Sequence, residues 1–191
     1  RIGYETEFPI PTHGVSEKLK PLVTIGNAIK NMKNKKGEIL NHDIESAKIS
    51  KELVRKRVEK IPEGKGIRYE KDEKAYLPKK LWLDVDWDTI SEGRLREEQY
   101  HRLGRKEVAP TIMTSRHTYF HPTETGYLTC REATAIQSFP NDYEFLGTVS
   151  QQWRQIGNAV PPLLGKAIGK AILKSIKTKK KATTLQSRIV R

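Results

Sequence analysis

The sequence of residues 127–145 is YLTCREATAIQSFPNDYEF, and it contains the clearest secondary-structure signals of the chain. Thr129 is followed three positions later by Glu132, which is the capping-box spacing that opens a helix. The helix is expected to stop before Phe139-Pro140, because the residue before a proline disfavours the helical conformation. This stretch therefore predicts a short helix with a defined start and a defined end.

A second informative stretch is residues 155–162, which read QIGNAVPP. Gly157 permits a tight turn that presents Asn158, whose side-chain amide can both donate and accept hydrogen bonds. Pro161-Pro162 suits the first turn of a helix. Apolar residues then recur along one face of that predicted last helix, at Leu164, Ile168, Ile172 and Ile176.

Weaker patterns precede these two stretches. We expect an extended connector over residues 1–20 and amphipathic helices over about 22–33 and 46–60. Alternating apolar residues predict a half-buried strand over residues 81–87, and residues 109–114 read as a strand that enters a loop. The sequence contains no internal repeat.

The chain is strongly basic, with 36 Lys and Arg against 23 Asp and Glu in 191 residues, a formal net charge of +13. Residues 174–191 contain seven basic residues and no acid, whereas residues 107–173 are balanced at five and five. A basic chain favours polyanionic partners, because each neutralised phosphate releases a counterion. For residues 177–191 alone, a solubilising tail and a nucleic-acid contact are equally good interpretations.

Several classes of protein are disfavoured. No apolar run approaches the roughly 18 residues that a membrane span needs, and no signal-like start is present. The single cysteine, Cys130, excludes an intramolecular disulfide framework, which is consistent with a reducing, cytoplasmic compartment. Residues 84–88 lack the glycine and glutamate of a calcium loop. His117, His121 and Cys130 lack a fourth metal ligand, so we expect no metal site.

Taken together, the two stretches resemble the carboxy-terminal end of the DNA (cytosine-5)-methyltransferases. Residues 127–145 contain the ninth motif, Leu-Thr-x-Arg-Glu followed by Gln-x-Phe-Pro, and residues 157–162 contain the tenth, Gly-Asn-Ala-Val-Pro-Pro. Residues 1–14 resemble the exit from the eighth motif. Residues 101–103, 109–112 and 121–122 resemble parts of the target recognition domain.

The resemblance implies an α+β fold, in which a small irregular mixed α/β target recognition domain precedes a helix that packs on a Rossmann-like methyltransferase domain. Its implied parts are a connector with a short helix (1–33), the target recognition domain (34–126), the ninth and tenth motif region (127–176) and a basic tail (177–191). The middle of the chain, residues 34–100, belongs to the family's variable part.

Three features of the family are missing from this sequence. The nucleophilic cysteine lies in a Pro-Cys-Gln motif and its helper in Glu-Asn-Val, while a glycine-rich loop binds S-adenosylmethionine; none of these is present. Cys130 occupies a variable position of the ninth motif, so we interpret it as a small buried thiol. Gly126 stands where the family often has arginine, a contact that Arg116 could supply.

The resemblance also implies roles for individual residues. Asn158 and the backbone near Val160 would contact S-adenosylmethionine, although Asn158 could instead be a structural cap. The Thr111-Ile112 pair would contact phosphate near the flipped base. Further expected DNA contacts flank this pair: Arg102, Arg105, Arg116 and His117. The motif residues expected to be structural are Arg131, Glu132, Phe139, Pro140 and Gly157.

We therefore expect the carboxy-terminal part of a DNA cytosine-5 methyltransferase of restriction-modification type, from a prokaryotic, nucleoid-associated setting. Since the sequence opens with Arg1, we expect a truncated chain or the small subunit of a split enzyme. Expected partners are duplex DNA and an amino-terminal catalytic part, with self-association through the last helix when that part is absent. The alternative is a non-enzymatic basic DNA-binding module or specificity subunit.

Overall fold

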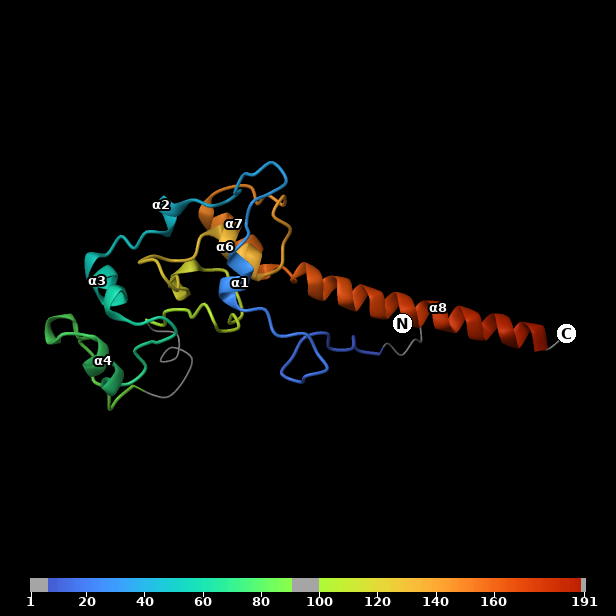
Figure 1. The fold of residues 1–191 in the computed structure, drawn as a ribbon, viewed down its shortest axis with the longest axis horizontal. Helices are drawn as coiled ribbons and strands as arrows, with labels where there is room; N and C mark the ends of the chain where they lie inside the picture. The colour runs from blue at the N-terminus through green and yellow to red at the C-terminus, as the bar shows by residue number, and fades with distance from the viewer. Residues whose placement is uncertain (1–6, 91–99, 190–191) are drawn as a thin grey trace. The chain divides into compact units, whose positions relative to one another are not determined.

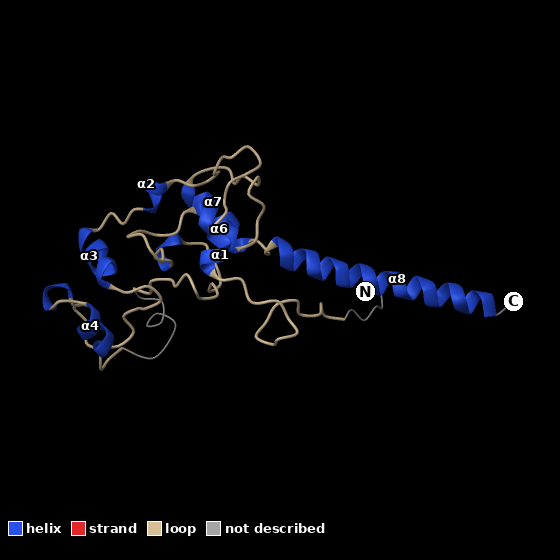
Figure 2. Ribbon diagram, viewed as in Figure 1, coloured by secondary structure: helices blue, strands red, loops and turns tan. Residues whose placement is uncertain are grey.

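The computed structural model describes residues 7–90 and 100–189 of the chain. It divides into two compact units, residues 23–159 and residues 1–22 with 160–191. Figure 1 shows the course of the chain, and Figure 2 shows that the larger unit is built from short helices joined by long loops. The helices of the larger unit are α1 (Ile25–Ile29), α2 (Ile44–Ala47), α3 (Glu52–Lys60), α4 (Glu70–Tyr76), η1 (Lys79–Leu81), η2 (Arg116–Thr118), α6 (Cys130–Ile136) and α7 (Val149–Asn158).

The capping box predicted at Thr129 is confirmed. Thr129 Oγ1 accepts a hydrogen bond from the Glu132 N–H at 3.2 Å, and a Glu132 carboxylate oxygen accepts one from the Thr129 N–H at 2.7 Å. Helix α6 ends at Ile136, ahead of Phe139-Pro140 as expected. It contacts both α1 and α7, so the ninth-motif helix lies at the centre of the larger unit.

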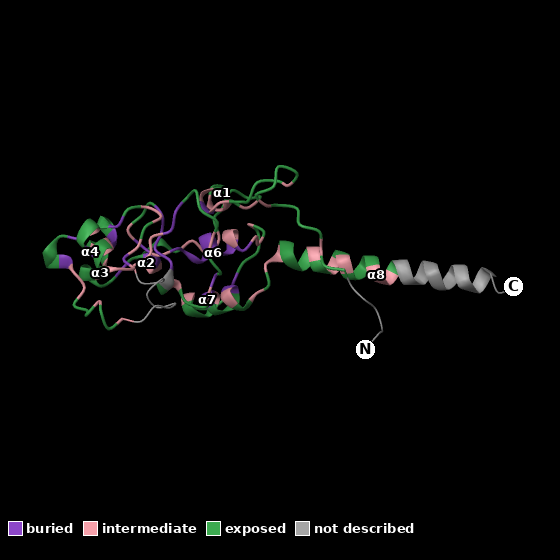
Figure 3. Cartoon of the chain, turned by 90° about the horizontal axis from the view of Figure 1, so that it is seen from below, coloured by how far each residue is buried: buried purple, intermediate pink, exposed green. Residues whose placement is uncertain are grey.

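The main core surrounds α6 and is formed mostly by residues from the second half of the chain. Its buried members are Ile25, Leu103, Ile112, Tyr119, Leu128, Cys130, Ala133, Phe145, Trp153 and Ile156. Two smaller clusters lie around α3 and α4, one built on Ile61, Ile67, Leu77 and Leu81 and the other on Ile49, Val58 and Phe120. Figure 3 shows this burial along the chain.

The two predicted strands are wrong, because side chains take the backbone hydrogen bonds that a neighbouring strand would have made. In the segment 81–87, Arg57 donates to the carbonyl oxygens of Leu81 and Trp82, and the buried carboxylate of Glu73 accepts from Leu83 N–H and the Trp87 indole. In the described part of the larger unit, backbone pairing is confined to isolated bridges: Lys48 with Gly126, Arg102 with Phe120, and Phe120 with Tyr127.

The single helix predicted over residues 46–60 is instead two helices, of which α3 covers the second part of the predicted range. Asp43 caps α2, which ends at Ala47, and α3 begins at Glu52. Between them Lys48 bridges to Gly126 and Ile49 enters a core cluster, so tertiary pairing interrupts the helix. The helix predicted over 22–33 is shortened to Ile25–Ile29, while α4 and α7 were not predicted.

The smaller unit consists of an amino-terminal segment and one long helix. The expected connector closes a small loop, in which the N–H groups of Gly14 and Lys20 donate to the carbonyl oxygens of Lys20 and Thr12. Helix α8 runs from Pro162 to Ile189, so it starts at the predicted proline and continues through the described part of the predicted tail. No helix among the described residues combines the length and apolar character that a membrane span requires.

Candidate nucleic-acid interface

The loop of residues 109–114, which carries the predicted Thr111-Ile112 pair, is held by one tyrosine. The Tyr119 hydroxyl donates to the Thr111 carbonyl oxygen and accepts from the Met113 N–H, each at 2.6 Å. The Ile112 side chain, between these two groups, is 6% exposed and belongs to the main core. The Thr111 side chain is exposed. The structure thus gives Ile112 a packing role and leaves Thr111 as the surface residue of the pair.

Gly157 and Asn158 end helix α7 and do not form the predicted turn. A Cβ atom at Gly157 would lie 2.4 Å from the Met113 carbonyl carbon and 2.5 Å from the Thr114 nitrogen. Glycine is therefore required because α7 touches the 109–114 loop. The Asn158 side chain is exposed, and in the smaller unit Val160 is 60% exposed.

Arg102, a predicted DNA contact, is engaged in hydrogen bonds within the protein. Its Nε donates to the His121 carbonyl oxygen, Nη1 to those of Val58 and Ile61, and Nη2 to those of Thr123 and Glu124. These five bonds engage the five N–H donors of a guanidinium group. Arg102 therefore fastens the 121–124 loop to the end of α3.

Arg105 is a surface residue with one acidic partner. Its guanidinium contacts both carboxylate oxygens of Glu63 at 3.0–3.1 Å, and its side chain is 59% exposed. The hydrogen bonds from Arg105 lower the pKa of Glu63 and raise the pKa of Arg105. A DNA phosphate would have to share or displace this carboxylate.

Arg116 and His117 lie on the single turn η2, and they differ in exposure. Arg116 donates to the Ser46 carbonyl oxygen and is half-buried, so it braces the segment beside Gly126. His117 is exposed, and its ring meets that of Tyr127 edge-on at 5.2 Å. Thr111, Arg105 and His117 are thus the predicted DNA contacts whose side chains reach the surface.

Arg131 of the ninth motif connects two loops from the inside of the protein. The side chain is fully buried and donates to the carbonyl oxygens of Leu40, Pro140 and Tyr143. Burial lowers the pKa of the guanidinium. Arg131 therefore joins the loop before α2 to the loop after α6. In the latter loop the ring of Phe139 packs against those of Tyr143 and Phe145, at 5.3 and 5.0 Å between centroids.

Glu132 adds a buried hydrogen bond from His121 to its capping role. Its Oε1 lies 3.3 Å from His121 Nε2, with both side chains about one-tenth exposed. Burial raises the pKa of Glu132, but the hydrogen bonds from His121 and from the Thr129 N–H outweigh it, so the pKa lies below its ordinary value. His121 Nδ1 accepts from the N–H groups of Thr123 and Glu124, which places the ring proton on Nε2, facing Glu132.

Cys130 is unsuited to nucleophilic attack. The thiol is buried at the start of α6, and burial raises its pKa to about 11. The thiolate is the reactive form of cysteine, so a raised pKa makes the group inert at neutral pH. Among the described residues, no three histidine, cysteine or acidic side chains gather in a way that could hold a metal ion.

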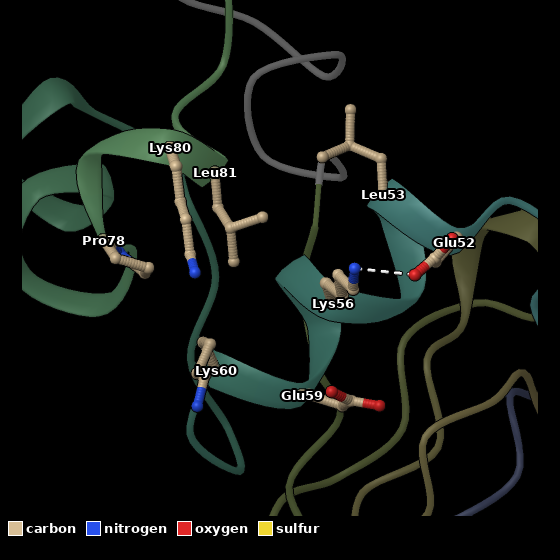
Figure 4. Close-up of a pocket in the computed structure, with 8 residues that line it drawn as sticks. All are labelled: Glu52, Leu53, Lys56, Glu59, Lys60, Pro78, Lys80 and Leu81. Carbon is tan, nitrogen blue, oxygen red and sulfur yellow. Dashed lines mark ion pairs between the residues drawn. The ribbon is translucent and has the colours of Figure 1, made fainter.

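A groove of about 520 Å³ lies between α3 and η1. Figure 4 shows lysines and apolar side chains lining it, with the Lys56–Glu52 ion pair at one side. Lys60 and Lys80 are exposed there, and in the described part of the chain neither has an ion-pair partner. The sequence showed that this region is basic, but it could not show that Lys60 and Lys80, which are twenty positions apart in the sequence, line the same groove.

Comparison with known proteins places these features in a family. Residues 2–174 match the sequence model of the C-5 cytosine-specific DNA methylases. The chain belongs to this family. The resemblance drawn from the ninth and tenth motifs is thus confirmed for the family, while the methylase roles of single residues stay predictions.

The relatives of this methylase chain include several type II methyltransferases. It is 34% identical over 176 residues to the type II methyltransferase M.NgoFVII of Neisseria gonorrhoeae, covering 90% of this chain and 42% of the relative. It is 34% identical over 164 residues to the putative type II methyltransferase M.MJ0563P of Methanocaldococcus jannaschii, covering 83% and 44%. The chain thus spans less than half the length of these two relatives.

A third relative is short. The type II methyltransferase M.AquIB of Picosynechococcus is 39% identical over 98 residues, which cover 42% of this chain and 70% of the relative.

Proposed function

We propose that this chain is the target-recognition and carboxy-terminal part of a DNA cytosine-5 methyltransferase of restriction-modification type, and that it acts with an amino-terminal catalytic part. One observation carries the proposal. Residues of the ninth motif and of helix α7 form a core that supports the 109–114 loop, while the chain's one cysteine lies inside that core. This arrangement suits a chain that presents the 109–114 loop to DNA and leaves the nucleophilic attack on cytosine to another part of the enzyme.

In this function the chain binds and orients duplex DNA. The Thr111 hydroxyl would accept or donate a hydrogen bond at a phosphate beside the target cytosine, and Arg105 and His117 would extend the contact along the backbone. Phosphate contacts fix the position of a protein on DNA, which matters because the reacting carbon is inaccessible until the base leaves the stack. We place base readout in residues 34–126, the proposed target recognition domain.

S-adenosylmethionine would supply the methyl group when bound in the assembled enzyme. The exposed amide of Asn158 fits this cofactor, since it offers one donor and one acceptor group at the end of a rigid helix. The backbone near Val160 is the second proposed contact. Because the rest of the cofactor site is assigned to the catalytic part, we expect the chain alone to bind S-adenosylmethionine poorly.

Helix α8 is the proposed contact with the catalytic part. Its apolar side chains Leu164, Ile168 and Ile172 are 51, 41 and 42% exposed and follow one another at helical spacing. We propose that they pack on the Rossmann-like domain of the catalytic part, and that the isolated chain self-associates through them. M.AquIB, 70% of whose length is matched by 42% of this chain, supports the proposal that part of such an enzyme can be a separate short chain.

The test is a mixing experiment with labelled S-adenosylmethionine and duplex DNA. The 191-residue chain is incubated alone and with an amino-terminal part that carries the Pro-Cys-Gln and Glu-Asn-Val motifs. We expect label in DNA only from the mixture, and the same activity from a mixture made with Cys130→Ala. Methyl transfer by the chain alone contradicts the proposal. DNA binding without activity in the mixture would instead favour the non-enzymatic DNA-binding module.

A further inference from the structure

The Tyr119 side chain connects the 109–114 loop to helix α7. Its hydroxyl bonds to the backbone on both sides of Ile112, at the Thr111 carbonyl oxygen and the Met113 N–H. Its ring is 2% exposed and stacks on the indole of Trp153, with 6.0 Å between centroids and 7° between planes. The ring is thereby fixed, so the position of the hydroxyl is fixed too.

Helix α7 touches the same loop at a second point. Gly157 lies one helical turn after Trp153, and its Cα faces the peptide between Met113 and Thr114 so closely that a methyl group would clash with backbone atoms. The Gln137 amide donates to the Ile156 carbonyl oxygen at 2.7 Å and holds this end of the helix. The loop therefore has two fixed contacts on its inner side, while the Thr111 side chain remains exposed on its outer side.

We propose that Tyr119 is a positioning residue for DNA recognition. Its hydroxyl fixes the backbone that presents Thr111, and its stacking on Trp153 holds that backbone at a fixed position relative to helix α7. The inference rests on the proposed function, because it assumes that Thr111 contacts the DNA. Since α7 ends at Asn158, the same contacts hold the DNA-side threonine and the cofactor-side asparagine on one rigid support.

This role differs from that of an ordinary core tyrosine. A phenylalanine ring would keep the packing against Trp153, but it would release the Thr111 carbonyl and the Met113 N–H together. The loop would then sample other conformations, and ordering it on DNA would weaken binding. The loss of hydrogen bonds of this kind corresponds to about a five- to tenfold change in the equilibrium constant for DNA binding.

The experiment compares Tyr119→Phe, Thr111→Ala and the double variant in the enzyme assembled with its catalytic part. Each single variant is expected to raise KM for duplex DNA about five- to tenfold and to leave KM for S-adenosylmethionine unchanged. The double variant is expected to be no worse than Thr111→Ala, because Tyr119 acts through Thr111. In the 191-residue chain, Tyr119→Phe is also expected to accelerate hydrogen exchange at the Met113 amide.

Two control variants separate positioning from stability. Tyr143→Phe removes a half-exposed hydroxyl without a hydrogen-bond partner among the described residues, and Thr134→Val removes the buried hydroxyl that donates to the Arg131 carbonyl oxygen. Neither should change KM for DNA. If Thr111→Ala raises KM and Tyr119→Phe does not, or if the two losses add, the positioning role is overturned. If Thr111→Ala has no effect, the proposed DNA contact fails as well.

Discussion

Arginines in this chain show where residue-level prediction from sequence succeeds and where it stops. Arg131 was expected to be structural from its motif, and in the structure its side chain is fully buried and bonded to three carbonyl oxygens. Arg102 was expected on DNA, yet its five donors bond to backbone carbonyls from two distant segments. A basic side chain near a candidate loop does not reveal from sequence which carbonyls will surround it.

At the scale of single residues, the atoms around Gly157 decide whether replacing it with alanine stabilises or destabilises the protein. Alanine is favoured over glycine by about 1 kcal/mol inside a helix, so Gly157→Ala would stabilise α7 if its surroundings were open. A Cβ atom would instead lie 2.4–2.6 Å from backbone atoms of Met113 and Thr114, which must move. We expect a net loss of about 1–3 kcal/mol in the free energy of unfolding, measured by urea denaturation.

Gly169→Ala is the matched control, since a Cβ atom there meets nothing within 4 Å in a helix of the same chain. It should leave the urea midpoint unchanged or raise it. A Gly157→Ala variant as stable as this control would show that α7 does not press on the 109–114 loop.

At the scale of elements, helices were predictable where the signals are local. Helices α6 and α8 follow from a capping box and a proline pair, and both begin where the sequence places them. The same signal was present for α7 and was missed: Thr148 and Gln151 have capping-box spacing, and Val149, Trp153 and Ile156 recur at helical intervals. The strands failed because Arg57, Glu73 and Tyr119 bond to backbone groups, which periodicity cannot detect.

The capping box of α7 gives a prediction at this scale. The Thr148 N–H donates to Gln151 Oε1 at 2.8 Å, and Thr148 Oγ1 accepts from the Gln151 N–H at 3.4 Å. Thr148→Ala is expected to lower the free energy of unfolding by about 1 kcal/mol, as loss of an N-cap does elsewhere. Thermal denaturation followed by circular dichroism measures it. Ser150→Ala, an exposed position two residues further on, should unfold within a degree or two of the unaltered chain.

At the scale of the whole molecule, the positive charge is distributed unevenly along the sequence. The 107–173 stretch, which contains the motifs and the 109–114 loop, carries equal numbers of acidic and basic residues. The excess lies in residues 30–74 and in the carboxy-terminal end, where no acid occurs after Glu144. Phosphate attraction and site recognition are therefore assigned to different parts of the chain, because nonspecific binding depends on total basic charge and recognition on a few positioned groups.

This division predicts opposite effects from deleting the tail and altering the loop. Residues 177–191 contain six basic residues and no acid, so their deletion should flatten the slope of log Kd against log salt by up to about five on duplex DNA. Replacing Lys177, Lys179, Lys180 and Lys181 with glutamine at full length should produce most of that change, because charge and not length is responsible. Neither variant should alter which site the assembled enzyme methylates.

Thr111→Ala should leave the salt slope within about one of its original value and lower methylation at the cognate site. A tail deletion that removes site preference, with Thr111→Ala methylating normally, would place recognition in the tail and refute the assignment to the loop.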